Sequence, residues 1–270
     1  MTVLDDALER ADPDCLTPAE EAELLRGAPW RRLVVLGDSI AAGVREPRAG
    51  YRDLCFADRL AAALADERGA PRDQLHRSRQ ADESGGTHYL NLGVPWACLT
   101  DVRDGQLPAA LRFEPDLALI VAGGNDTPRP GYDPDQAWRE LLDIALPLVD
   151  RGALVVTIGL FDLARSGLVS PRTAATMAGL LDRLDTITAA VAAQVGGLHV
   201  DTHHHPRAAD PAIFASDRVH ANAAGHAIAS AAIIRALAAR CRGEALDALA
   251  PVSGRGAGRA RPVSGAERPP

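Results

Sequence analysis

Short apolar runs that end in glycine or a polar residue recur along the chain. They are RRLVVLGDS (31–39), THYLNLG (87–93), LALIVAGG (117–124), ALVVTIG (153–159) and LHVDT (198–202). A continuous apolar run of this length is typical of a strand that is buried on both faces of a parallel sheet. Between the runs, apolar residues return every three or four positions, which predicts helices at about 52–68, 99–112, 133–150, 170–195 and 221–242.

This alternation of strand and helix predicts an α/β fold, a three-layer α/β/α sandwich around a roughly five-stranded parallel sheet. The chain has 270 residues, of which 47% are hydrophobic, and this is enough for one substantial core. We expect a helical leader over 1–30, with its helix at 18–27, and a core domain over 31–245. The segment 246–270 is rich in Pro, Gly, Arg and Ser and is predicted to be a disordered tail.

Composition narrows the classes of partner. The net charge is -7 and the basic residues are scattered, so we expect no nucleic-acid partner. The N-terminal sequence lacks the features of a signal peptide, and no run approaches the roughly 18 apolar residues of a membrane span. We therefore expect a cytoplasmic protein, and make no prediction of its oligomeric state. Four widely spaced cysteines are expected to be reduced and packed: Cys15, Cys55, Cys98 and Cys241.

Candidate catalytic residues stand at the ends of three predicted strands. Ser39 follows Gly37 and Asp38, and there its hydroxyl can lie beside the free N–H groups of the next turn. Gly93 and Asn125 end the second and third runs, where a close backbone N–H and a neutral amide suit an oxyanion hole. Taken singly, the serine also fits a helix N-cap and the other two fit ordinary turns.

A histidine near the last helix offers a proton-transfer group. His220 lies in SDRVHANAAGH, and Asn222 is placed to cap the helix that follows. A histidine titrates near neutral pH, and Asp217 stands close enough to accept a hydrogen bond from its other ring nitrogen. The same residues also fit an exposed loop without catalytic function.

Four segments together resemble the signature blocks of the SGNH/GDSL hydrolase family. They are VVLGDSIAAG, NLGVPWA, VAGGND and SDRVHANAAGH, and the resemblance covers about 31–240. It implies a flavodoxin-like catalytic domain with Ser39 as nucleophile, His220 as general base and Asp217 as the residue that orients it. It also implies an oxyanion hole made by the N–H groups of Ser39 and Gly93 with the Asn125 amide.

These residues predict a serine esterase that acts through an acyl-serine on a small-molecule ester, without a cofactor. We expect the ester of a small or polar metabolite rather than of a long-chain lipid, because no long exposed apolar segment is evident. Two alternatives stay open. The same acyl-enzyme could pass its acyl group to an alcohol or amine, which would make the protein an acyltransferase, or the chain could be a binding module that has lost its activity.

Other residues have two interpretations each. Trp96 is expected either to form a wall of the acyl pocket or to pack under the adjacent helix. Arg45 is expected either to bind an anionic group of the substrate or to form an ion pair. The loop 161–173, beginning with Phe161, would form a lid that contacts substrate, or passive surface.

A histidine run at His203, His204 and His205, with His199 and Asp201 before it, raises the possibility of a metal site. Consecutive histidines rarely point at one ion, so we predict no metal. No G-x-G-x-x-G fingerprint follows the first strand, which disfavours a dinucleotide site.

Overall fold

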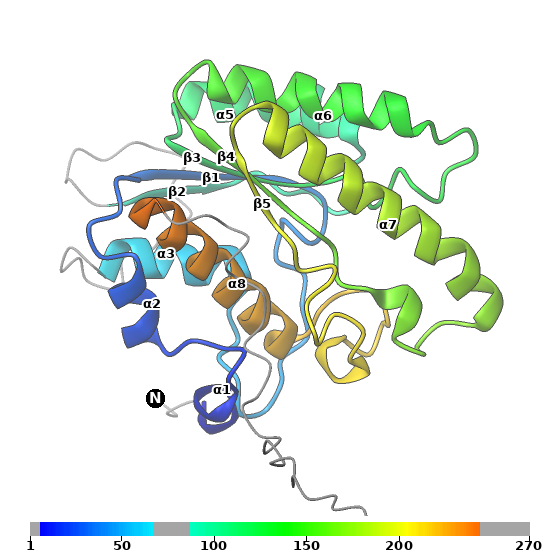
Figure 1. Ribbon diagram of the computed structural model, residues 1–270, viewed down its shortest axis with the longest axis horizontal. Coiled ribbons are helices and arrows are strands. Elements are labelled where there is room, and N and C mark those ends of the chain that lie inside the picture. The colour runs from blue at the N-terminus through cyan, green and yellow to red at the C-terminus, as the bar shows by residue number, and fades with distance from the viewer. Residues whose placement is uncertain (1–5, 67–86, 244–270) are drawn as a thin grey trace, which may run out of the picture.

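The five apolar runs form the strands of one parallel sheet in a computed structural model, which describes residues 6–66 and 87–243 (Figure 1). The strands are β1 (Arg32–Gly37), β2 (His88–Asn91), β3 (Leu117–Val121), β4 (Leu154–Ile158) and β5 (Leu198–Val200). Their order is β2-β1-β3-β4-β5, and every neighbouring pair is parallel. The prediction of a five-stranded parallel sheet is confirmed.

Helices cover both faces of the sheet, as Figure 1 shows. One layer holds α2 (Pro18–Leu24), α3 (Phe56–Asp66) and α8 (Ala223–Arg242), and the other holds α5 (Leu107–Phe113), α6 (Pro134–Val149) and α7 (Pro171–Gln194). Successive strand residues point to opposite faces, so Val35 packs in the core under α3 and α8, whereas Val34 packs in the core under α6. Both faces are therefore apolar, which explains why the runs show no alternation with polar residues.

The order of the strands determines where a ligand site lies. The chain leaves β1 for β2 at the edge and then returns to β3 on the other side of β1. Ligands of such sheets bind beyond the carboxyl ends of the strands, where this reversal opens a crevice. The segments that follow β1 and β3 flank this point.

The predicted helix over 99–112 is interrupted. The structure has α4 (Leu99–Asp101), a π-helical segment η2 (Val102–Gln106) and then α5, whose second residue is Pro108. Pro108 has no N–H to donate to Asp104 O, and the Leu107 N–H before it donates five residues back to Val102 O rather than four residues back to Arg103 O. The periodicity is helical throughout, but the proline and Gly105 favour the wider turn.

The N-terminal segment forms α1 (Ala7–Ala11) and α2, and buried charges hold it to α3. Arg59 is 1% exposed and donates to both carboxylate oxygens of Glu9, at 2.6 and 3.1 Å. Arg52 bridges Glu9 and Glu21 at 2.6 and 2.8 Å. The domain boundary near residue 30 stays a prediction, and the tail predicted at 246–270 lies outside the described residues.

Two further short helices, η3 (Leu163–Arg165) and η4 (Pro211–Ile213), lie in loops. In the described part of the chain, no helix combines the length and the apolar character that crossing a membrane requires. The four cysteines are free, and only Cys241 is exposed.

We predict that Glu9→Ala lowers the free energy of unfolding by about 3–5 kcal/mol, because it leaves Arg59 buried without its counter-charge. Urea denaturation measures the change, and Glu23→Ala, in the exposed Glu23–Arg26 pair, is the control with a loss below about 1 kcal/mol. The double variant Glu9→Met, Arg59→Met should recover much of the loss. Equal effects of Glu9→Ala and the control would show that the buried pair does not hold the segment.

Candidate active site

Ser39 occupies a sharp turn directly after β1, and a glycine makes this turn possible. Gly37 has a φ of +142°, and a Cβ there would lie 1.8 Å from Val121 O on the neighbouring strand. The next residue, Asp38, donates its N–H to the same carbonyl at 3.2 Å. This close approach ends the strand and leaves Ser39 at the carboxyl end of the sheet, half-buried.

The π-helical segment η2 supports this strand end through a buried side chain that the sequence did not single out. Gln106 accepts from Gly37 N–H and donates to Gly37 O, each at 2.8 Å, and it is 6% exposed. It adds to the one backbone bond that Gly37 has beyond the end of the β1–β2 pairing, in which the Val94 N–H donates to Gly37 O at 3.1 Å. The Gln106 contact spans 69 positions, so no local pattern could have revealed it.

A short closed loop carries Asp217 and His220. An antiparallel bridge between Phe214 and Ala221 closes the loop. Within it, Arg218 has a φ of +59°, and the Asp217 carboxylate accepts from the N–H of His220 at 3.0 Å. These bonds fix the backbone so that the His220 ring returns toward its own aspartate.

Asn222 attaches this loop to α8. Its side-chain oxygen accepts from the N–H of Ala224 at 2.9 Å and caps the helix, as predicted. Its amide donates to Ala212 O and Phe214 O, both at 2.9 Å. The asparagine is 6% exposed, so these bonds are shielded from water and hold the loop base against the helix start.

A continuous chain of hydrogen bonds joins the three predicted catalytic residues. His220 Nδ1 donates to Asp217 Oδ2 at 2.7 Å, and its Nε2 lies 2.8 Å from Ser39 Oγ. An ionised carboxylate only accepts, so the ring proton belongs on Nδ1 and the bare Nε2 accepts from the serine hydroxyl. Burial raises the pKa of Asp217, but the hydrogen bonds from His220 outweigh it and leave the pKa below its usual value.

The predicted oxyanion donors differ in availability. Among the described residues, the Ser39 N–H donates to no protein acceptor. Asn125 lines the same cavity as Ser39, and its amide makes one bond, to Ala97 O at 3.0 Å. An amide group has two N–H donors, so one of them is left for a ligand.

Gly93 is close to the nucleophile turn but its N–H is already used. A Cβ on Gly93 would lie 2.3 Å from Ala42 N, so only glycine fits against this turn. The Gly93 N–H donates to Asn91 Oδ1 at 2.9 Å, and the residue lines a separate surface hollow, not the cavity of Ser39. To bind an oxyanion, this N–H would have to share or exchange its bond to Asn91.

Asp38 lies on the cavity wall beside Ser39 and is 3% exposed. Burial raises the pKa of Asp38 to about 6, although the Ile40 N–H donates to its Oδ1 at 2.9 Å and His220 attracts its charge. One hydrogen bond does not replace the water that an ionised carboxylate loses. The site therefore contains two carboxyl groups with opposite pKa shifts.

The cavity that contains Ser39 and His220 has a volume of about 490 Å³ and a mainly apolar lining. This volume lies in the range of pockets that bind whole small molecules. Its walls come from the ends of β1, β3 and β4, the loop with η3, and α7. Large apolar side chains on these walls include Ile40, Ile158, Leu160, Leu163, Met177 and Leu180.

Two residues predicted to bind substrate do not reach this cavity. Arg45 donates to Asp53 Oδ1 at 2.7 Å and to two backbone carbonyls, so it forms an ion pair. Trp96 is 79% exposed, because its left-handed backbone, with a φ of +69°, turns it away from both the cavity and the next helix. Phe161, in contrast, lines the cavity and contacts the edge of Phe214, so the start of the loop 161–173 belongs to the wall.

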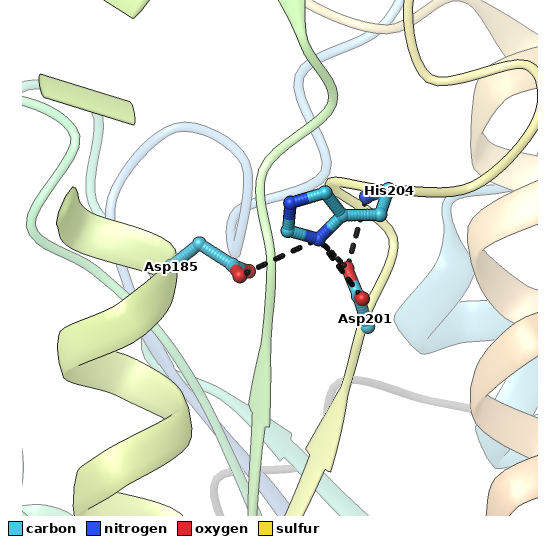
Figure 2. A group of neighbouring side chains, drawn as sticks. All are labelled: Asp185, Asp201 and His204. Atoms are coloured by element: carbon cyan, nitrogen blue, oxygen red, sulfur yellow. Dashed lines mark hydrogen bonds and ion pairs between the residues drawn. The ribbon is translucent and has the colours of Figure 1, made fainter. Parts of the chain in front are cut away.

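The three consecutive histidines point to different neighbours. The buried His203 bonds to Leu160 O and Asp182, at 2.8 and 2.9 Å, and a nitrogen of His205 lies 3.8 Å from Asp14. Only His204 joins acidic groups that could hold an ion, as Figure 2 shows with Asp185 and Asp201.

The distances within this last group are those of hydrogen bonds and ion pairs. His204 Nδ1 lies 3.0 Å from both oxygens of Asp201 and 3.8 Å from Asp185. Asp185 also contacts His199 at 3.1 Å. Asp185 lies behind the cavity-lining Gly159, but the Ser39 cavity is lined by none of the residues of this group.

A parallel sheet with a Ser–His–Asp chain beyond its carboxyl ends defines a serine hydrolase of the three-layer α/β class. The sequence pattern of the GDSL-like lipase/acylhydrolase family matches residues 35–228, and the chain belongs to this family. It is thus an ester-hydrolysing enzyme, as the sequence predicted. No curated protein sequence matches the chain significantly.

Several solved structures share the fold. An alpha/beta hydrolase from the metagenome of Lake Arreo, Spain, is 20% identical with a TM-score of 0.56, over 77% of this chain and 94% of its own. An acetylxylan esterase from Geobacillus stearothermophilus is 19% identical, with the same TM-score and coverage. A lipase/acylhydrolase from Enterococcus faecalis is 19% identical with a TM-score of 0.56, over 78% of this chain and 96% of its own.

We predict that Asp38→Asn stabilises the fold more at pH 8 than at pH 4. A carboxyl whose pKa rises on folding contributes stability that is present below the unfolded pKa, near 3.8, and is lost as pH rises through about 6. The difference in unfolding free energy between variant and parent should grow by on the order of 2–3 kcal/mol between these pH values. Urea denaturation at both pH values measures it, with the exposed Asp143→Asn as control, and a difference independent of pH would contradict the prediction.

Proposed function

We propose that the protein hydrolyses a carboxylic ester through an acyl-serine, with Ser39 as nucleophile, His220 as general base and Asp217 as its orienting group. The observation that carries this proposal is the hydrogen-bond chain from Asp217 through His220 to Ser39 Oγ, which opens into the 490 Å³ cavity. The family membership and the acylhydrolase and esterase activities in the names of the structural neighbours support the same reaction.

In the first half-reaction, Ser39 Oγ attacks the ester carbonyl while His220 Nε2 takes the hydroxyl proton. The resulting imidazolium keeps its Nδ1–H bond to the Asp217 carboxylate. His220 then gives the proton from Nε2 to the alkoxy leaving group, and the alcohol departs. Water, activated by His220 in the same way, attacks the acyl-serine, releases the acid and restores Ser39.

The negative oxygen of the tetrahedral intermediate needs donors that are in place before the reaction. The Ser39 N–H and the second N–H of Asn125 meet this need without rearrangement, since neither has a protein acceptor among the described residues. We assign Gly93 as a third donor that engages only when its bond to Asn91 is shared. Its glycine contact with the nucleophile turn supports this assignment.

Hydrolysis is favoured over acyl transfer by the exposure of the proton-transfer loop. Residues 216–219, which lead to His220, are all exposed. The loop that carries His220 therefore lies at the solvent-exposed rim of the site, and we infer that water reaches His220 from this rim. An acyltransferase needs an acceptor site that excludes water there.

We predict that Ser39→Ala loses esterase activity on p-nitrophenyl acetate, by on the order of 10⁶-fold, while thermal unfolding stays cooperative. The covalent route requires the hydroxyl, so a fluorophosphonate probe should label the parent and not the variant. Undiminished activity would place the nucleophile elsewhere, and a folded parent that neither labels nor turns over would indicate a binding module.

We predict that Asn125→Ala lowers kcat by roughly 10²- to 10³-fold, the usual loss for one oxyanion donor, with little change in KM. Steady-state kinetics on the same ester measures both constants. Asn125→Asp, which is similar in shape but carries a negative charge, should be at least as damaging. A loss below twofold in the alanine variant would remove Asn125 from the oxyanion hole.

A further inference from the structure

The cavity beside Ser39 is lined mainly by apolar side chains. Its lining contains no Arg or Glu among the described residues, and its ionisable side chains are Asp38, His220 and His226. His226 is engaged by the backbone, since its Nδ1 accepts from Phe56 N–H and its Nε2 donates to Val44 O. The threonine hydroxyls in the lining already bond to neighbouring groups: those of Thr127, Thr176 and Thr202 donate to backbone carbonyls, and that of Thr173 pairs with Ser170. A polar acyl group with several hydroxyls, such as a sugar acid, would therefore find few free partners here, which is costly.

One wall of the cavity comes from the first half of α7. Thr176, Met177 and Leu180 lie on it, opposite residues that follow β4 such as Leu160. Figure 1 shows this half of α7 extending past the ends of the strands toward the loop that contains η3. The helix therefore encloses space that an acetyl group next to Ser39 would leave empty.

The position of His220 decides which part of the ester this space receives. His220 must protonate the leaving oxygen, so the alcohol part lies on the side of Nε2. The loop that leads to His220 is exposed at 216–219, and its Val219 also lines the rim of the cavity. We therefore place the alcohol part at this exposed loop and the acyl chain against the apolar wall that α7 forms.

We propose that the enzyme prefers esters of unbranched aliphatic acids of medium length, and that Met177 on α7 limits the length of the acyl chain. This inference rests on the proposed function and replaces the sequence-based expectation of a polar metabolite ester. The sequence could not take account of the apolar residues of α7, the β4 end and the η3 loop, because they are far apart in sequence and line one cavity only in the fold.

A series of p-nitrophenyl esters from acetate to dodecanoate tests the preference. Each methylene that enters the cavity should raise kcat/KM roughly fourfold, until the chain fills the space and the gain stops. A second series, alkyl acetates from methyl to octyl, should be nearly flat. If kcat/KM is highest for acetate, or if the alcohol series rises instead, the proposal is overturned.

The two variants Met177→Trp and Met177→Ala test the role of α7. The tryptophan should lower the ratio of octanoate to acetate kcat/KM by tenfold or more, and the alanine should move the optimum to longer acids. Ala175→Trp, at an exposed position of the same helix, is the matched control and should leave the ratio within about twofold. A ratio unchanged in both Met177 variants would exclude this wall from the acyl site.

The tests separate this inference from the proposed function. Loss of all ester hydrolysis in the parent, with no labelling of Ser39, would overturn both. Hydrolysis that depends on Ser39 but falls with acyl length would overturn the chain-length inference alone. If Met177→Trp does not fold, the two ester series on the parent still decide the preference.

Discussion

The hydrogen bond between His220 Nε2 and Ser39 Oγ joins residues 181 positions apart, and much of the fold serves to make it. Ser39 is held by the end of β1, near the centre of the sheet, and His220 by a loop that precedes the last helix. Because β1 lies beside β3, and α8 packs against α3 and β5 in the same core, both ends of the bond are fixed by the core. A 2.8 Å contact is thus maintained by packing rather than by local chain geometry.

Fixing the serine depends on backbone contacts that leave no room for side chains. Gly37 lies close to Val121 O, and the Gln106 side chain makes two hydrogen bonds to the Gly37 backbone beside the one from the Val94 N–H. The π-helical turn that presents Gln106 lies directly before the helix turn that contains Pro108. An irregularity in one helix therefore supports the strand end on which the nucleophile stands, a common location for such turns.

The parts of the molecule that local chemistry dictates could be predicted from sequence. Apolar runs predicted all five strands, and the capping preference of Asn222 predicted the start of α8. Ser39, Asp217 and His220 were found through their resemblance to a family, which carries information about packing that a single residue does not.

Predictions that depended on side-chain direction were less successful. Trp96 follows the second strand in the right place for a pocket wall, but one left-handed φ turns it to solvent. Arg45 is near Ser39 in sequence, but its guanidinium forms an ion pair with Asp53, eight residues later. Gln106 and the α7 wall were missed because their contacts connect distant segments.

The two carboxyl groups near His220 show how environment assigns different tasks to one type of side chain. Asp217 is exposed and accepts hydrogen bonds from Val219 N–H, His220 N–H and His220 Nδ1. These bonds keep its pKa below the usual value and favour the ionised carboxylate. Asp38 is buried with one backbone donor, and its pKa of about 6 means that it becomes charged only as the pH approaches neutrality.

In the proposed mechanism, an ionised Asp38 attracts the imidazolium that forms when His220 takes the serine proton, because opposite charges interact strongly in a buried environment. The same charge costs stability, since the folded protein must hold it away from solvent. An apolar cavity therefore lowers the stability of the folded protein when it contains a buried carboxylate on its wall. In the proposed mechanism the cavity and the carboxylate act together, because the burial that makes the Asp38 charge costly also strengthens its attraction for His220.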